Sequence, residues 1–141
     1  MGTEGSAFWD DLAEDLKDPE FLREYVRESV RIQTIDQLVN ALDDAREAAG
    51  LSKAALARAV RAEPAVVRRL FSASRVNPTL GTLAEIAAAL GMRVTLEPLP
   101  PADQEYVTAP LLEGECADTK ALAEHVAGMR EQRRGEGERV A

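Results

Sequence analysis

The stretch LSKAALARAVRAEPAVVRRLFSASRVNP, residues 51–78, decides how this chain is expected to fold. Ser52 is placed to cap a helix that ends near Val60, and Pro64 occupies the first position of the next helix. Apolar residues recur at helical spacing in both segments, so each helix has one face for a core. Residues 61–63 form a short turn between them. Two short helices joined in this way match a helix-turn-helix, whose second helix lies in the major groove of DNA.

Basic residues are concentrated in this stretch, although the chain is acidic overall. Residues 50–79 hold six bases and one acid, whereas the 141-residue chain has a formal net charge of −8. Residues 1–28 hold nine acids and three bases, a net charge of −6. The acidic total argues against general adhesion to nucleic acid, but a local basic block is the electrostatic footprint of a protein that binds a chosen DNA site.

Helices are expected on both sides of the stretch. An apolar stripe with a threonine and glutamine capping box predicts a helix over residues 34–49 that stops at Gly50. A second stripe predicts a helix over residues 79–90, and two more are expected over residues 6–17 and from residue 19 onward. No proline interrupts residues 20–50, so the helices that begin at residues 19 and 34 could also be one long helix.

The period of the apolar residues changes after Gly91. Met92, Val94 and Leu96 alternate with polar residues, which predicts a short C-terminal strand that ends before Pro98. A lone strand is unstable, so this strand needs a partner. The partner is either the same strand of a second subunit or residues 106–108.

These patterns divide the chain into four parts. Proline-rich, aperiodic residues are typical of a linker, and a weak apolar stripe near the C-terminus predicts an amphipathic helix. The expected parts are an acidic helical extension over 1–33, a helix-turn-helix DNA-binding domain over 34–98, a linker over 99–117 and a tail with an amphipathic helix over 118–141.

Several classes of function are not expected. No apolar run is long enough to span a bilayer and the N-terminus is acidic, which favours a cytoplasmic protein without a membrane partner. One cysteine, Cys116, and one histidine, His125, cannot build a thiolate or imidazole metal site. The sequence has no glycine-rich phosphate loop, serine elbow or histidine-centred site, so we expect neither an enzyme nor a cofactor.

Residues 51–97 resemble the Cro/C1-type (XRE) helix-turn-helix family. The matching positions are Leu51-Ser52, Leu56-Ala57, Val60, Val67, Leu70, Asn77-Pro78-Thr79-Leu80, Thr82-Leu83, Ile86-Ala87 and Ala89-Leu90-Gly91. The resemblance implies an all-α fold, a compact lambda-repressor-like domain of four to five helices. It also implies a regulator of transcription, a repressor by preference, that binds a palindromic site in double-stranded DNA as a homodimer.

The resemblance also assigns roles along the recognition helix. Its exposed face would consist of Pro64, Ala65, Val66, Arg68 and Arg69. Arg69 and Arg68 would bond to guanine, and Ala65 and Val66 would touch thymine methyl groups. The inner face would be formed by Val67, Leu70 and Phe71.

Five further residues are expected to hold the DNA backbone. Ser52 and Lys53 lie at the start of the preceding helix, where free N–H groups and the helix dipole attract a phosphate. Arg75, Asn77 and Thr79 would contact the backbone on the other side.

Two positions depart from the family pattern. Arg61 stands where the family has glycine, so either a left-handed backbone there costs about 1 kcal/mol or the turn is shaped differently. Glu63 replaces the usual serine or threonine cap of the recognition helix, although its charge suits the helix dipole.

The segment LAEDLKDPEFLREYV, residues 12–26, resembles the leader of HigA-like antitoxins. That resemblance implies a protein that neutralises a basic ribonuclease toxin and represses its own operon. An acidic arm suits a basic partner, since opposite charges speed encounter, but an acidic face can also serve solubility alone. A third alternative is a helix-turn-helix domain that binds only protein, with its arginines facing a partner.

Overall fold

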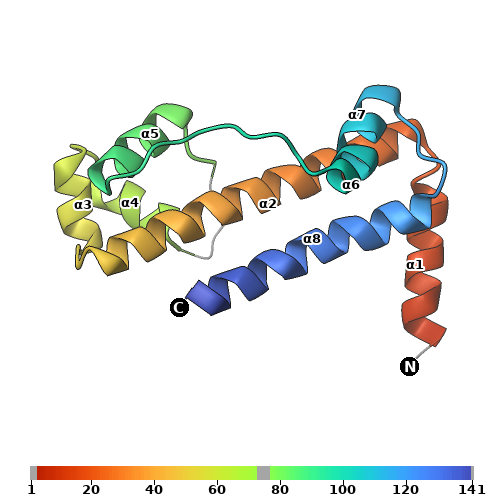
Figure 1. The fold of residues 1–141 in the computed structure, drawn as a ribbon, viewed down its shortest axis with the longest axis horizontal. Coiled ribbons are helices and arrows are strands. Elements are labelled where there is room, and N and C mark those ends of the chain that lie inside the picture. The colour runs from red at the N-terminus through yellow and green to blue at the C-terminus, as the bar shows by residue number, and fades with distance from the viewer. Residues whose placement is uncertain (1–2, 73–76, 141) are drawn as a thin grey trace. The chain divides into compact units, whose positions relative to one another are not determined.

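The computed structural model describes residues 3–72 and 77–140, with side chains over residues 7–72 and 77–129. All regular elements in these residues are helical (Figure 1), so the expected all-α class is confirmed for this part of the chain. The elements are α1 (Thr3–Asp15), α2 (Pro19–Ala48), α3 (Lys53–Ala59), α4 (Pro64–Leu70), α5 (Leu80–Ala89), α6 (Pro101–Asp103), the π-helical turn η1 (Gln104–Thr108), α7 (Ala109–Glu113) and α8 (Thr119–Val140). No described helix is both long and apolar enough to cross a membrane.

The chain divides into two compact units. The terminal unit joins the residues up to Gln33 to Pro98–Val140, and the central unit is Thr34–Glu97. The helix α2 supplies residues to both, because the boundary falls within it.

Residues 19–48 form one helix, which decides between the two sequence alternatives. The Asp18 carboxylate accepts a hydrogen bond from the Glu20 amide at 3.1 Å, as expected for a cap at this helix start. No break occurs at Thr34, so the capping box predicted there does not form. The helix ends where expected, because Gly50 has a φ of 70°, a left-handed conformation that costs glycine little.

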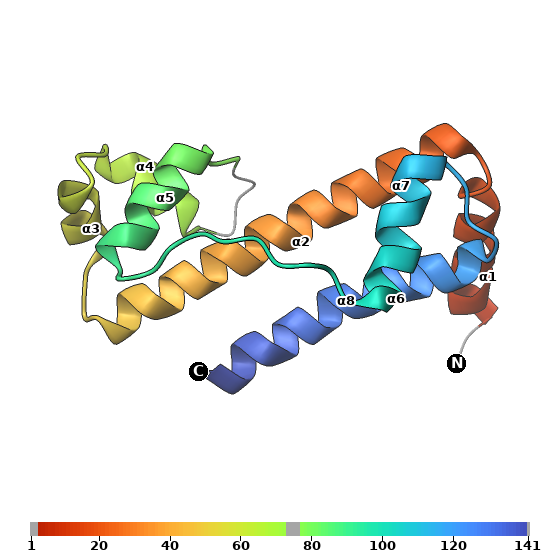
Figure 2. The same ribbon diagram turned by 45° about the horizontal axis from the view of Figure 1, so that its top comes forward.

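The core of the central unit joins α2, α3, α4 and α5 (Figure 2). Its buried side chains are Leu42, Leu56, Ala57, Val67, Leu70, Leu83, Ile86 and Ala87. The apolar stripes predicted for the helices within residues 34–90 all contribute to this one cluster. Burial of these stripes stabilises helices that are too short to be stable alone, since α3 and α4 have seven residues each.

Arg46 supports this core from the end of α2. Its guanidinium is bonded to the Asp43 carboxylate at 2.9 Å and to the Leu51 carbonyl at 2.8 Å, and lies 5.7 Å from the centroid of the Phe71 ring. The side chain is only 14% exposed. Arg46 therefore connects the C-terminal end of α2 to Leu51, before α3, and to Phe71, after α4.

The terminal unit has a separate core. Its buried side chains are Leu16, Leu22, Val26, Val107, Leu122, Ala123 and Val126. Three of these residues, Leu122, Ala123 and Val126, come from α8, the helix that forms in the C-terminal tail. His125 of α8 lies 2.7 Å from the Asp103 carboxylate and 5.0 Å, centroid to centroid, from the Tyr106 ring. His125 thus packs within this unit.

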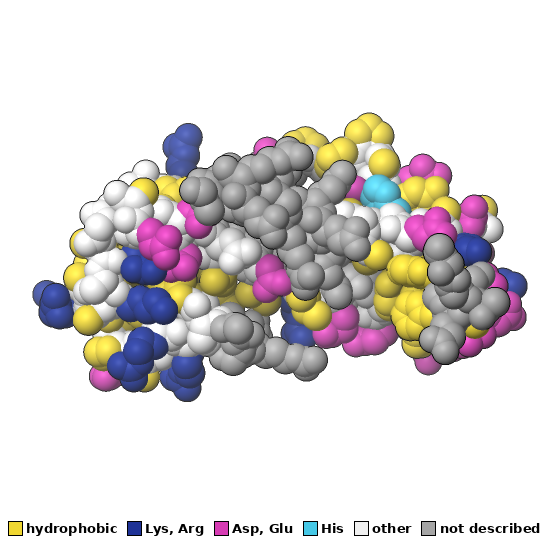
Figure 3. Space-filling view, turned by 90° about the horizontal axis from the view of Figure 1, so that it is seen from below, with side chains coloured by type: hydrophobic (Ala, Val, Ile, Leu, Met, Phe, Trp, Pro, Cys, Tyr) yellow, Lys and Arg dark blue, Asp and Glu magenta, His cyan; other side chains and the backbone are white. Residues whose placement is uncertain are grey.

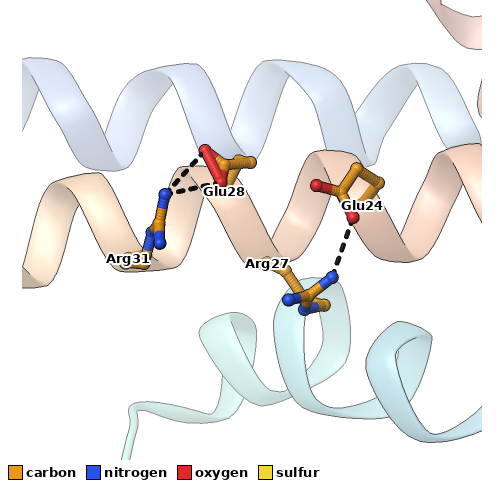
Figure 4. A network of polar contacts seen from close by, with 4 residues as sticks. All are labelled: Glu24, Arg27, Glu28 and Arg31. Atoms are coloured by element: carbon orange, nitrogen blue, oxygen red, sulfur yellow. Dashed lines mark hydrogen bonds and ion pairs between the residues drawn. The ribbon is translucent and has the colours of Figure 1, made fainter.

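Ion pairs one helical turn apart cover the exposed side of α2 in the terminal unit. Arg27 contacts Glu24 at 2.8 Å and Arg31 contacts Glu28 at 2.8 Å (Figure 4). Lys17 pairs with Glu14 and Lys120 with Asp10. The Arg23 guanidinium donates to the Leu111 and Leu112 carbonyls at 3.1 and 3.2 Å. Each described lysine and arginine of the terminal unit therefore has a partner.

The linker predicted over residues 99–117 is wrong for residues 101–113, which form α6, η1 and α7. The prolines that suggested a linker stand at helix starts, where a missing N–H is not needed. Val107 and Pro110 are buried in the terminal unit. Gly114, with a φ of 76°, ends the run.

The C-terminal strand is not formed in the single chain. Residues 92–96 lie in no helix or strand. The intramolecular partner considered for it, residues 106–108, lies in η1 and has no strand edge to offer. A strand needs a neighbour to bond with, and the described chain supplies none.

Candidate nucleic-acid interface

The turn between α3 and α4 has a left-handed residue at its centre. Arg61 has a φ of 53°, and no other non-glycine residue of the described chain has a positive φ. The Ala62 amide donates to the Ala57 carbonyl at 2.9 Å across this residue. This is the bond that usually closes a helix ending in glycine. Of the two sequence alternatives, the strained backbone at Arg61 is therefore the one observed.

The start of α4 is held without a side-chain cap. Glu63 has an extended backbone and makes no capping bond, while Pro64 begins the helix with its fixed φ. The Val66 amide donates to the Glu63 carbonyl at 2.9 Å. The weak cap expected from the sequence is confirmed.

The helix α4 has an inner and an outer face. Val67 is fully buried and Leu70 is 4% exposed, and both belong to the central core. Phe71, also expected to face inward, is half-buried against that core. The exposed residues are Pro64, Ala65, Val66, Arg68 and Arg69. These are the five residues that the sequence assigns to the outer face.

The residues assigned to the DNA backbone lie at two helix starts. Ser52 caps α3, its hydroxyl accepting from the Ala55 amide at 3.0 Å, and Lys53 follows it. Thr79 caps α5 by accepting from the Thr82 amide at 3.1 Å and also donates to the Thr82 hydroxyl at 2.9 Å. The Thr79 hydroxyl therefore already donates its one proton within the protein. Asn77 is exposed, whereas Arg75 lies outside the described residues.

An open hollow of about 350 Å³ lies between α4 and the start of α5. It brings together Val66, Arg69, Asn77 and Thr79 of the predicted set, and is also lined by Leu70, Pro78 and Thr82. Of the other predicted residues that the structure describes, none lines this hollow. Thr82 was not predicted, although its position three residues after a capping threonine was a usable signal.

The cations of α3, α4 and the turn between them have no acidic partner among the described residues. Among the described residues, no carboxylate lies within ion-pair distance of Lys53, Arg58, Arg61, Arg68 or Arg69. Glu63 is the one acid in residues 50–79. Lysine and arginine side chains gather over the part of the central unit that holds α3 and α4, at the left of Figure 3. Such a surface attracts a polyanion.

The comparisons with known proteins agree with this geometry. Residues 37–99 match a family described as a helix-turn-helix domain. The match covers α3, α4 and α5 and residues 37–48 of α2. No curated protein and no solved structure matches the chain.

Proposed function

We propose that the central unit binds double-stranded DNA, with the outer face of α4 in the major groove. The observation that carries this proposal is the pair of exposed cations on α4, Arg68 and Arg69. Both lie within the residues that match a helix-turn-helix domain, and neither has a carboxylate within ion-pair distance among the described residues. Arg69 would read guanine and Arg68 would assist it, because a guanidinium can donate two hydrogen bonds to guanine O6 and N7. Lys53 and the start of α3 would hold phosphate.

The biological role that fits is regulation of transcription, as a repressor that acts as a homodimer on a palindrome. Half-sites about one helical turn apart would place two copies of α4 in successive major grooves.

A band-shift assay tests DNA binding. The protein is titrated against the DNA upstream of its own coding sequence and against a scrambled duplex of equal length. We expect retention of the first at concentrations at least about a thousandfold lower than the second. Equal retention of both duplexes would refute site-specific binding. Retention of neither duplex would favour the third alternative, a helix-turn-helix used only for protein contacts. Unchanged retention by Arg68→Ala with Arg69→Ala would show that these arginines do not contact the DNA.

A second candidate function, neutralisation of a basic toxin, is supported by the surface of α1. Phe8 is 61% exposed, and among the described residues Asp11 and Asp15 have no ion pair. An exposed aromatic side chain beside free acids suits a basic protein partner. Capture of a basic gene product encoded next to this protein, weakened in Phe8→Ala, would support it. Failure of the unaltered protein to capture that product would remove it.

A further inference from the structure

The segment between α5 and the terminal unit exposes apolar side chains. Met92 is 43% exposed, Val94 37% and Leu96 96%. The Met92 amide donates to the Ala87 carbonyl at 2.8 Å. Beyond it, no backbone N–H or C=O of residues 93–97 bonds to another described residue. The segment thus carries both the apolar surface and the free backbone groups of an unpaired strand edge.

Gly91 and Pro98 set the two ends of this segment through their backbone constraints. Gly91, with a φ of 77°, turns the backbone out of α5. Pro98 has no N–H and so ends any hydrogen-bonded ladder. Between them, residues 92–97 alternate apolar and polar side chains, which matches the two faces of an extended strand.

The segment is complementary to itself when two copies run antiparallel. With Thr95 opposite Thr95, the register places Val94 opposite Leu96 at two positions. The same register sets Arg93 of each copy opposite Glu97 of the other, which gives two pairs of opposite charge. Cross-strand pairs of these kinds stabilise a sheet. A parallel, in-register arrangement would instead oppose arginine to arginine and glutamate to glutamate, so charge selects the antiparallel one.

We propose that residues 93–97 pair with the same residues of a second copy of this chain, as an antiparallel ribbon centred on Thr95. The ribbon joins two central units and brings Val94 of each copy against Leu96 of the other. It deepens the proposed function by supplying the contact of the dimer. The proposed ribbon rests on that function only for the role of the dimer, since pairing of two copies can be measured without DNA.

Two charge reversals test the register. Arg93→Glu turns both charge pairs into acid against acid, and Glu97→Arg turns both into base against base. Sedimentation equilibrium at low salt should show each variant dimerising about tenfold or more weakly than the unaltered protein. An equimolar mixture of the two variants should dimerise as tightly as the unaltered protein. In a mixed ribbon, acid again faces base at both positions.

Matched controls are the same reversals at exposed helical positions, Arg58→Glu and Glu85→Arg, which should leave the dimer unchanged. Circular dichroism should show native helix content in all variants, because residues 93 and 97 lie outside both cores. A monomeric unaltered protein, unweakened single variants, or a mixture no tighter than its components would overturn the ribbon. Such a result would leave the band-shift test of DNA binding standing. Conversely, failure of that test would leave the dimer measurement intact.

Discussion

The two units differ in whether their lysine and arginine side chains have bonding partners. In the terminal unit, each described lysine and arginine meets a carboxylate or a backbone carbonyl (Figure 4). In the central unit, Arg46 is paired in the same manner, but the cations of α3 and α4 have no carboxylate within ion-pair distance among the described residues. The reason lies in the sequence, where acids stand three residues from bases in residues 14–31 and are nearly absent from residues 50–79.

This difference indicates which charges are available to a partner. A cation that is already paired gains little from a phosphate, because it must give up its carboxylate. A free cation exchanges only water and small ions, and release of counterions from DNA then favours binding. The basic block is therefore the part of the surface where we expect an anionic partner.

The largest effect is expected when cations are removed from each unit in turn. Arg68→Ala with Arg69→Ala should weaken binding of the upstream DNA by about 1–3 kcal/mol for each bidentate arginine–guanine pair that the substitutions remove. Arg27→Ala with Arg31→Ala removes the same charge from the terminal unit and should leave binding within about twofold. Fluorescence anisotropy with a labelled duplex measures both. Equal losses would show that net charge, and not the position of the charge, controls binding.

A second test introduces into α4 a helical ion pair like those of the terminal unit. Ala65→Glu places a carboxylate four residues before Arg69, where it can form a helical ion pair. We expect DNA affinity to fall about tenfold, because the new acid occupies Arg69 and repels phosphate. The matched control is Ala65→Gln, which has a similar size and no charge. If both variants lose the same affinity, the cause is steric and the charge argument does not hold.

The left-handed residue offers a third test. Arg61→Gly should raise the free energy of unfolding by about 1 kcal/mol, since glycine adopts this conformation without strain. Urea denaturation measures the change. Arg61→Ala removes the same charge but keeps the strain, so it should give no such gain. An equal gain in both variants would attribute the effect to charge repulsion among the free cations.

The smallest effect on the free energy of unfolding is expected at an exposed cation that already has an ion-pair partner. Arg31→Ala should lower the free energy of unfolding by less than about 0.5 kcal/mol, because the Arg31–Glu28 pair is largely exposed. Urea denaturation at low and high salt is the measurement. A loss above about 1 kcal/mol would mean that these pairs hold the terminal unit together.

Local signals account for what the sequence could predict. Proline at residues 19 and 64 and glycine at residue 50 mark helix boundaries by their own backbone constraints, so these boundaries needed no tertiary information. The faces of α4 followed from the spacing of Val67 and Leu70. The separation of α3 from α4 also followed from local pattern, and with it the position of the basic surface.

Features that depend on distant contacts could not be predicted. The helices of residues 101–113 were not predicted because of their prolines. Val107 of these residues is buried in a core built from both ends of the chain, and Pro110 is buried as well. The contacts of Arg46 with the Leu51 carbonyl and the Phe71 ring gave no sequence signal. A strand at residues 92–96 was predicted from pattern alone, but pattern cannot supply the neighbour that it needs.

The dependence of DNA affinity on salt tests the central claim most directly. The logarithm of the association constant should fall linearly with the logarithm of salt concentration, with a slope of about −0.9 for each phosphate neutralised. Lys53→Ala should make this slope shallower by about 0.9, whereas Arg31→Ala should leave it unchanged. A slope that is the same in the unaltered protein and in Lys53→Ala, or one that changes equally in both variants, would contradict the claim that the free cations of the central unit meet the DNA backbone.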